Sequence, residues 1–250
     1  MVRPTRYQGG MLDARDTWIF DLDNTLYPAG CELFRQIDAN MTAFIQDRFE
    51  IGRDEAFRLQ KDLYVKHGTT LFGLMAEHDV CPHAFMEAAH DIDVSELPVD
   101  PGLRARIAAL PGQRYIYTNG SLRHAENVAT RLGLWDLFDG AFDVEMGGWT
   151  PKPHRAPYEA FVAHFGLDPA RAVFFEDMAD NLIVPAEMGM ATVLVQSDAA
   201  WLDAEPAAKR SARPGEAPSH VHYATADLTG FLAGLTRAAP TSKRDHGARA

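Results

Sequence analysis

The sequence predicts an α/β protein in which a parallel sheet has helices on both faces and an all-helical segment is inserted. From residue 97 onward, short apolar stretches alternate with stretches of helical periodicity, as in the right-handed crossovers of a parallel sheet. Between residues 29 and 96 only helical periodicity is found. We therefore expect a core formed by residues 1–28 and 97–236, a helical cap at residues 29–96, and a disordered tail at residues 237–250.

The first strand and the inserted helices follow directly from the apolar pattern. Trp18–Phe20 is apolar without alternation, which is typical of a strand buried on both faces. Pro28 and Gly30 then break the pattern before the helical segment begins. Apolar residues recur at helical spacing in four blocks: Leu33 to Phe49, Ala56 to Leu63, Leu71 to Met75, and Phe85 to Ile92.

The second part of the chain alternates helices and strands. Gly133 and Gly166 are placed to end helices, and Pro185 fits only the first turn of one. The predicted elements are a helix at 103–110, strand Tyr115–Tyr117, a helix capped by Ser121, a strand within 138–144, a helix at 158–165, strand Ala172–Phe175, a helix containing Pro185, strand Ala191–Val195, an edge strand at 221–223 and a helix at 228–235. Residues 197–219, rich in Pro, Ala and charge, predict a mobile surface loop.

Composition limits the possible partners. The 250 residues suffice for one domain with a large insertion or for two domains, and the net charge of −11 disfavours a nucleic-acid surface. Cys31 and Cys81 lack metal-ligand spacing, and no apolar run has the length of a signal or membrane segment. We expect a cytoplasmic protein that binds no nucleic-acid polymer and no membrane; these features leave its oligomeric state open.

Polar side chains follow several predicted strands. Asp21 and Asp23 come directly after the first strand, Thr118 follows the second, and Glu176 and Asp177 follow the strand at 172–175. Parallel strands bind ligands at their carboxyl ends, although a lone Asp-x-Asp pair is equally consistent with a turn. Adjacent carboxylates repel one another without a cation, so a metal ion is expected here. His220 and His222 form a weaker metal candidate, because no third ligand lies near them in the sequence.

Together these motifs resemble the haloacid dehalogenase superfamily, in its phosphatase branch. The resemblance rests on Asp21-Leu22-Asp23-Asn24-Thr25, Tyr117-Thr118-Asn119-Gly120, Thr150-Pro151-Lys152-Pro153 and Phe174 to Asn181. It implies that Asp21 attacks phosphorus to form an aspartyl-phosphate and that Asp23 is the general acid and base. It further implies that Thr118, Asn119 and Gly120 hold the phosphate, that Thr25 assists, and that Lys152 neutralises charge. The presence of Asp23 favours phosphatases over dehalogenases.

The same resemblance implies Mg²⁺ as the cofactor. Its ligands would be the carboxylates of Asp21 and Asp177 and the backbone carbonyl of Asp23, with Glu176 acting directly or through water. Asp180 and Asn181 would contact these ligand residues and not the metal ion itself. Magnesium prefers such oxygen donors.

Within the superfamily, the sequence is most similar to pyrimidine 5′-nucleotidases. The similarity lies in Asp21 to Pro28, Gly68-Thr69-Thr70-Leu71, and the segment from Tyr117 through Ser121 to His124-Ala125. It implies that the substrate is a small phosphorylated metabolite, with UMP and CMP as the first choices. It also implies that Gly68, Thr69 and Thr70 contact this substrate. Those three residues are equally consistent with an interhelical turn. The alternatives are a phosphatase or phosphomutase for sugar phosphates or phosphoglycolate, and a non-catalytic binding protein.

Overall fold

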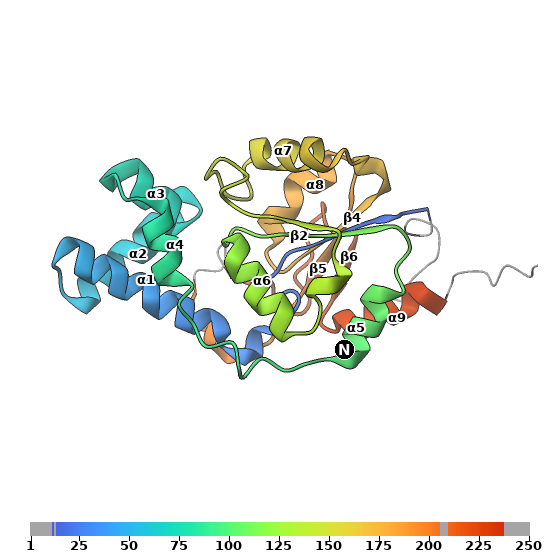
Figure 1. Ribbon diagram of the computed structural model, residues 1–250, viewed down its shortest axis with the longest axis horizontal. Helices are drawn as coiled ribbons and strands as arrows, with labels where there is room; N and C mark the ends of the chain where they lie inside the picture. The colour runs from blue at the N-terminus through green and yellow to red at the C-terminus, as the bar shows by residue number, and fades with distance from the viewer. Residues whose placement is uncertain (1–11, 13, 206–209, 238–250) are drawn as a thin grey trace, which may run out of the picture.

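A six-stranded parallel sheet forms the centre of the protein in a computed structural model that describes residues 12, 14–205 and 210–237 (Figure 1). The strands are β1 (Thr17–Phe20), β2 (Gln113–Tyr117), β3 (Gly140–Phe142), β4 (Ala172–Glu176), β5 (Ala191–Val195) and β6 (Tyr223–Thr225). Their order is β3-β2-β1-β4-β5-β6, and each neighbouring pair is parallel. The predicted parallel sheet is confirmed. Residues 1–11 and 13, and all but the first residue of the tail expected at 237–250, lie outside the described residues.

Strand β1 is buried on both faces, as its apolar composition predicts. Trp18 and Phe20 belong to one hydrophobic cluster, and Ile19 belongs to the cluster on the opposite face. Phe20 stacks on Phe175 of β4 with ring centroids 4.5 Å apart. This packing fixes the point at which the chain leaves β1 and enters the segment that contains Asp21 and Asp23.

Helices cover both faces of the sheet (Figure 1). One face carries α5 (Pro101–Ala108), α6 (Leu122–Arg131) and α9 (Leu228–Arg237), and the other carries α7 (Arg155–Phe165) and α8 (Ile183–Glu187). Short 3₁₀ helices are η1 (Ala29–Cys31), η2 (Trp135–Leu137), η3 (Pro169–Arg171), η4 (Ala179–Leu182) and η5 (Ala200–Ala204). Ser121 caps α6 and Gly166 ends α7 with a positive φ, as expected.

Four helices fill the segment between β1 and α5, which we name the helical insertion. They are α1 (Leu33–Phe49), α2 (Arg53–His67), α3 (Thr70–His78) and α4 (Pro82–Ala89), and they form a lobe beside the sheet (Figure 1). The insertion has its own hydrophobic cluster, which includes Ile45, Leu63, Leu74 and Phe85. Val144, which follows β3, packs into that cluster and joins the insertion to the core.

Two predictions for the last third of the chain are wrong. Strand β6 begins at Tyr223 rather than Val221, because the amide of Val221 donates to the Pro218 carbonyl (2.9 Å) in a turn. The segment 197–219 is not a detached surface loop where it is described, since Ser211 and Ala212 are buried. The amide of Ala212 donates to the Asp177 carbonyl over 2.8 Å and holds the segment against β4.

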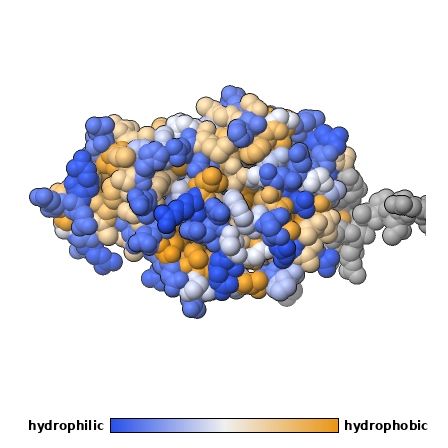
Figure 2. Space-filling model, in the orientation of Figure 1, coloured by the Kyte–Doolittle hydropathy of each residue, from blue (hydrophilic) through white to orange (hydrophobic). Residues whose placement is uncertain are grey.

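Hydrophilic and apolar residues are interspersed over the face shown in Figure 2. Among the described residues, no helix combines the length and the apolar character needed to cross a bilayer. The cytoplasmic location expected from the sequence stays a prediction.

Candidate active site

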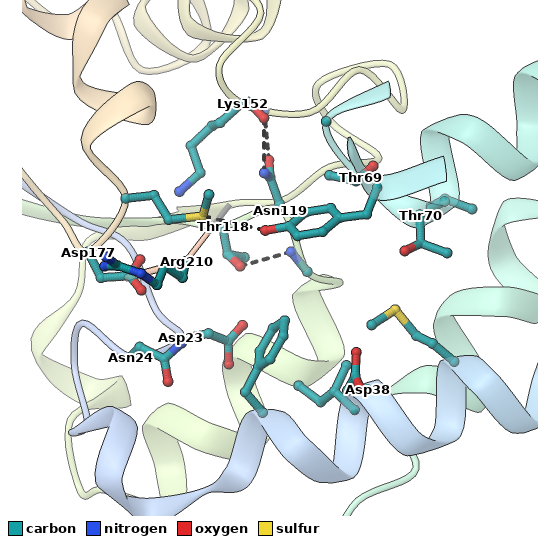
Figure 3. Close-up of a pocket in the computed structure, with 18 of the residues that line it drawn as sticks. Asp23, Asn24, Asp38, Thr69, Thr70, Thr118, Asn119, Lys152, Asp177 and Arg210 are labelled. Atoms are coloured by element: carbon teal, nitrogen blue, oxygen red, sulfur yellow. Dashed lines mark hydrogen bonds between the residues drawn. The ribbon is translucent and has the colours of Figure 1, made fainter. Parts of the chain in front are cut away.

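The carboxyl ends of three neighbouring strands bring the predicted functional residues together. Asp21 and Asp23 follow β1, Thr118 follows β2, and Glu176 and Asp177 stand at the end of β4. All five line one cavity between the core and the helical insertion. Figure 3 shows Asp23, Thr118, Lys152 and Asp177 on the core side, with Asp38, Thr69 and Thr70 on the opposite side.

Lys152, from the loop between β3 and α7, reaches the centre of this arrangement. Its Nζ donates to Asp21 Oδ1 (2.7 Å), to Glu176 Oε2 (3.1 Å) and to the Tyr117 carbonyl (3.0 Å). Only 1% of the lysine side chain is exposed. Burial disfavours the ammonium, but the charges of Asp21 and Glu176 outweigh this effect and raise the pKa of Lys152. Lys152 is therefore a fixed positive charge beside the Asp21 carboxylate.

Asn119 holds the backbone of Lys152. Its Oδ1 accepts from the Lys152 amide (2.8 Å), and its Nδ2 donates to the Lys152 carbonyl (3.2 Å) (Figure 3). Asn119 also lines the cavity, so its expected contact with phosphate stays a prediction beside this contact with the lysine loop.

Asp21, Glu176 and Asp177 form a buried carboxylate cluster in which one oxygen of each lies within 4.8 Å of the others. Burial, and next the charge of Asp21, raise the pKa of Asp177 to about 7 and that of Glu176 well above its ordinary value. Burial also raises the pKa of Asp21. One lysine faces three carboxylates, so the donor set and its excess negative charge fit a divalent cation such as Mg²⁺.

The histidine pair considered as a second metal candidate is used elsewhere. Nε2 of His220 lies 2.7 Å from the Ala179 carbonyl, and Nδ1 of His222 lies 2.8 Å from Thr192 Oγ1. Within the described ranges, the carboxylate cluster is the one group of three or more potential metal ligands.

Asp23 has surroundings quite different from those of Asp21. Its Oδ1 accepts from the Tyr27 hydroxyl (2.6 Å) and lies 2.8 Å from His124 Nε2. Burial raises the pKa of Asp23, but the charge and hydrogen bond of His124 and the Tyr27 hydrogen bond outweigh it and lower that pKa to about 2. Without a ligand, Asp23 is therefore a carboxylate at neutral pH.

Two threonines lie close to the strand tips. Thr118 Oγ1 accepts from the Gly120 amide (2.9 Å), and both residues line the cavity. Thr25 Oγ1 donates to Asp21 Oδ2 (3.0 Å), and Thr25 is not among the described residues that line the cavity. Thr25 thus orients the Asp21 carboxylate, and its expected assistance in holding the substrate stays a prediction.

Gly68, Thr69 and Thr70 line the opposite side of the cavity, and they also form the interhelical turn that was the alternative interpretation. Gly68, with φ +89°, ends α2, and Thr69 Oγ1 accepts from the Phe72 amide (3.1 Å) at the start of α3. Thr70 Oγ1 donates to the Gln60 carbonyl (3.3 Å). The hydroxyl of Thr70 is therefore committed to the fold of the insertion.

A second layer of residues holds the carboxylates in place. Asn181 Nδ2 donates to Glu176, as the expected supporting role requires, whereas Asp180 is exposed at the cavity wall. Ser211 Oγ donates to Asp177 Oδ2 from the segment expected to be a surface loop. That segment also brings Trp201, Glu205 and Arg210 to the cavity wall.

Several of these contacts were not predicted from the sequence. His124 was noted only as part of a motif similarity, although its place in the first turn of α6 after Thr118 was an available signal. Tyr27 and Ser211 gave no comparable signal. The cavity wall from the insertion, including Phe34, Asp38, Met41, Lys61 and Tyr64, was also not predicted.

The fold and the site define an α/β protein with an acidic centre at the carboxyl edge of its parallel sheet. The haloacid dehalogenase-like hydrolase family matches residues 16–189. The chain belongs to that family.

Sequence relatives include phosphatases. The chain is 26% identical to phosphate metabolism protein 8 of Saccharomyces cerevisiae over 198 residues, 72% of this chain and 61% of that protein. It is 38% identical to enolase-phosphatase E1 of Frankia alni over 101 residues, 39% of this chain and 41% of that protein. The match to the Xylella fastidiosa (strain 9a5c) enolase-phosphatase E1 is 35% identical over 32% of this chain and 35% of that protein. The chain thus spans less than two thirds of the length of each relative.

Solved structures show the same fold. A phosphatase of this family from Thermococcus onnurineus superposes with a TM-score of 0.59 at 17% identity, covering 88% of this chain and 97% of the other. The L-2-haloacid dehalogenase from Xanthobacter autotrophicus, with chloropropionic acid covalently bound, gives 0.55 at 19% identity, covering 90% and 100%.

Magnesium should stabilise the protein more at pH 8 than at pH 5. The folded-state pKa of Asp177, about 7, lies above its ordinary value of 3.8, so the stability from its bound proton is lost as the pH rises through 7. Magnesium compensates for that loss, whereas at pH 5 the proton competes with it and weakens binding by on the order of 100-fold. Thermal midpoints of chelator-treated protein with and without Mg²⁺ check this. An equal or larger gain at pH 5 would contradict it.

Replacing Ser211 with alanine should weaken magnesium binding by about 10-fold, because Asp177 loses a donor that orients it. The measurement is the rise in thermal midpoint as Mg²⁺ is added. Ser219→Ala, an exposed serine in the same segment, is the matched control and should leave the titration unchanged. Identical titrations for the two variants would show that Ser211 has no part in holding Asp177.

Proposed function

We propose that this protein is a magnesium-dependent phosphomonoester hydrolase that acts through an aspartyl-phosphate on Asp21. The observation that carries the proposal is the pairing of Asp21 Oδ1 with a buried lysine inside a carboxylate cluster at the carboxyl edge of the sheet. A carboxylate nucleophile held beside a fixed cation suits attack on an anionic phosphoryl group. Thr118 and the backbone around Gly120 offer donors to its oxygens.

The reaction has two displacements. A proton taken up with the substrate resides on Asp23. Asp21 attacks phosphorus while the ester oxygen leaves with the bond's electron pair and takes that proton. A water molecule then loses a proton to Asp23 and attacks the phosphorus, which breaks the Asp21–phosphorus bond and releases phosphate. Such acid–base help is worth about 10²–10⁴-fold in rate. In the second displacement the ionised form of Asp23, which its low pKa maintains, accepts the proton.

Mg²⁺ would be held by the carboxylates of Asp21 and Asp177 and the carbonyl of Asp23, and Glu176 would bind it directly or through water. When bound, the ion would neutralise charge on the phosphoryl oxygens. The residues that line the cavity do not by themselves supply enough positive charge to bind a phosphate. The cavity lining includes seven acidic residues and three lysines or arginines: Asp21, Asp23, Asp38, Glu176, Asp177, Asp180 and Glu205 against Lys61, Lys152 and Arg210. A phosphate dianion entering such a cavity requires additional positive charge.

For the substrate, we propose a pyrimidine nucleoside 5′-monophosphate, UMP or CMP. The motif similarity motivates it, and the cavity supports it in two ways. Phe34, Met41 and Tyr64 offer surfaces on which a flat base could stack, and Asp38 and Lys61 offer polar groups beyond them. The retention of Asp21, Asp23, Lys152 and Asp177 disfavours a non-catalytic binding protein.

Asp21→Asn should lower kcat by about 10³-fold or more, because the amide oxygen is a poor nucleophile while the side-chain volume is kept. The measurement is phosphate release with Mg²⁺, together with a thermal midpoint to show that the fold is intact. Asp62→Asn, at an exposed position of α2, is the control and should retain full activity. Near-normal turnover by Asp21→Asn would rule out covalent catalysis at this residue.

Among UMP, CMP, AMP, GMP and phosphoglycolate at equal concentration, UMP or CMP should give the highest kcat/KM. The single rings of Phe34 and Tyr64, on the insertion side of the cavity, match a six-membered base in size better than a purine. Initial rates of phosphate release decide this. If a purine nucleotide or phosphoglycolate gave the highest kcat/KM, the proposed phosphatase activity would be retained and the pyrimidine nucleotide substrate would be ruled out.

A further inference from the structure

Asp23 is connected to a stacked pair of histidines that the reaction scheme above does not use. The imidazole of His124, with 1% of its side chain exposed, places Nε2 2.8 Å from Asp23 Oδ1. The ring of His90 stacks on it, with centroids 4.2 Å apart and planes 7° from parallel. His90 comes from the end of α4 in the helical insertion, whereas His124 lies in the first turn of α6.

Ser121 fixes both histidines. Its Oγ accepts from the His124 amide (3.3 Å) as the cap of α6, and the same oxygen lies 2.9 Å from His90 Nδ1. The His124 ring is thus confined by its own helix, by a stacked partner and by the carboxylate. Because ionised Asp23 can only accept, Nε2 of His124 carries the proton of the hydrogen bond between them.

The contacts of Asp23 are unequal between its two oxygens. The donors from the described residues, the Tyr27 hydroxyl and His124 Nε2, both go to Oδ1. Asp23 lines the cavity and 17% of its side chain is exposed, so its carboxylate is reachable by a ligand. With Oδ1 occupied twice, Oδ2 is the oxygen left for proton exchange with a ligand.

We propose that His124 is a positioning residue for Asp23, which holds Oδ1 so that Oδ2 faces the leaving group of the substrate. This inference rests on the proposed function, because it assumes that Asp23 exchanges protons during phosphoryl transfer. In the first displacement the proton passes from Oδ2 to the ester oxygen as the phosphorus–oxygen bond breaks. In the second, Oδ2 takes the proton of the attacking water. His124 keeps its own proton throughout.

The test uses leaving groups that differ in their need for a proton. A 2,4-dinitrophenolate leaves without protonation, whereas an alkoxide does not, so a misplaced acid affects mainly the alkyl ester. His124→Ala should slow formation of the phosphoenzyme from an alkyl phosphate by about 10²-fold, the cost expected of a displaced catalytic group, and from 2,4-dinitrophenyl phosphate by less than about 3-fold. Rapid-quench single turnovers with Mg²⁺ measure both rates.

Two further variants sharpen the result. His124→Gln can place an amide N–H near the position of Nε2 and should recover at least about 10-fold of the alkyl-ester rate, which a mere cavity-filling role would not require. His164→Ala, at an exposed histidine of α7, should leave both rates unchanged. Both esters are compared on the same preparation, so a loss of folded protein would lower both signals equally and could not produce a selective loss on the alkyl ester.

The outcomes separate the two proposals. Equal losses on both esters, or no loss on either, would overturn the role of His124 while the wild-type phosphoenzyme still supports the phosphatase. Absence of a phosphoenzyme in the wild type, or full turnover by Asp21→Asn, would overturn the proposed function itself. A selective loss on the alkyl ester that His124→Gln partly restores is the expected result.

Discussion

The buried contact between Lys152 and the carboxylates of Asp21 and Glu176 is the constraint on which the site depends. Removing one partner from such a buried pair typically costs about 3–5 kcal/mol, because it leaves an uncompensated charge away from water. The lysine is enclosed by aromatic rings, with Nζ 5.3 Å from the ring centre of Tyr117 and 5.7 Å from that of Phe174. The carboxyl ends of β1, β2 and β4 and the loop after β3 must therefore be packed together before the charges of Lys152, Asp21 and Glu176 compensate one another.

From that constraint follows the difference between Asp21 and Asp23, which are separated by one residue. Burial in the carboxylate cluster raises the pKa of Asp21, while His124 and Tyr27 lower that of Asp23. Both aspartates line the cavity, but their partners differ: Lys152 and Thr25 bind Asp21, whereas Tyr27 and His124 bind Asp23. Two carboxyl groups whose environments move their pKa values apart are the usual arrangement for a pair with different chemical roles.

The parts of the site that sequence could predict are those in which one local pattern carries the information. A fully apolar strand followed by a carboxylate identifies the carboxyl edge of the sheet, and this holds for both Asp21 and Asp177. The hydrogen bond between Asp23 and His124 joins residues 101 positions apart, and that between Asp177 and Ser211 joins residues 34 apart. Such contacts depend on how α6 and the segment after β5 pack, which composition does not encode. The charged, Pro-rich composition of 197–219 even favoured the wrong interpretation.

The same distinction explains why the reaction class is easier to infer than the substrate. The core side of the cavity is built from strand ends and consists of groups suited to a phosphate and a cation. Its opposite wall is built by the helical insertion and by Trp201, Leu202, Glu205 and Arg210. There Lys61 pairs with Asp38 and with Glu205 of the core, each at 2.8 Å, and Trp201 donates to the Ala29 carbonyl (2.8 Å). Under the proposed function, selectivity for the leaving group is expected from that wall, because the core side offers the groups that suit the phosphate common to all phosphomonoesters. Because Lys61 belongs to α2 and Glu205 follows η5 in the core, their ion pair joins the insertion to the core at the cavity wall.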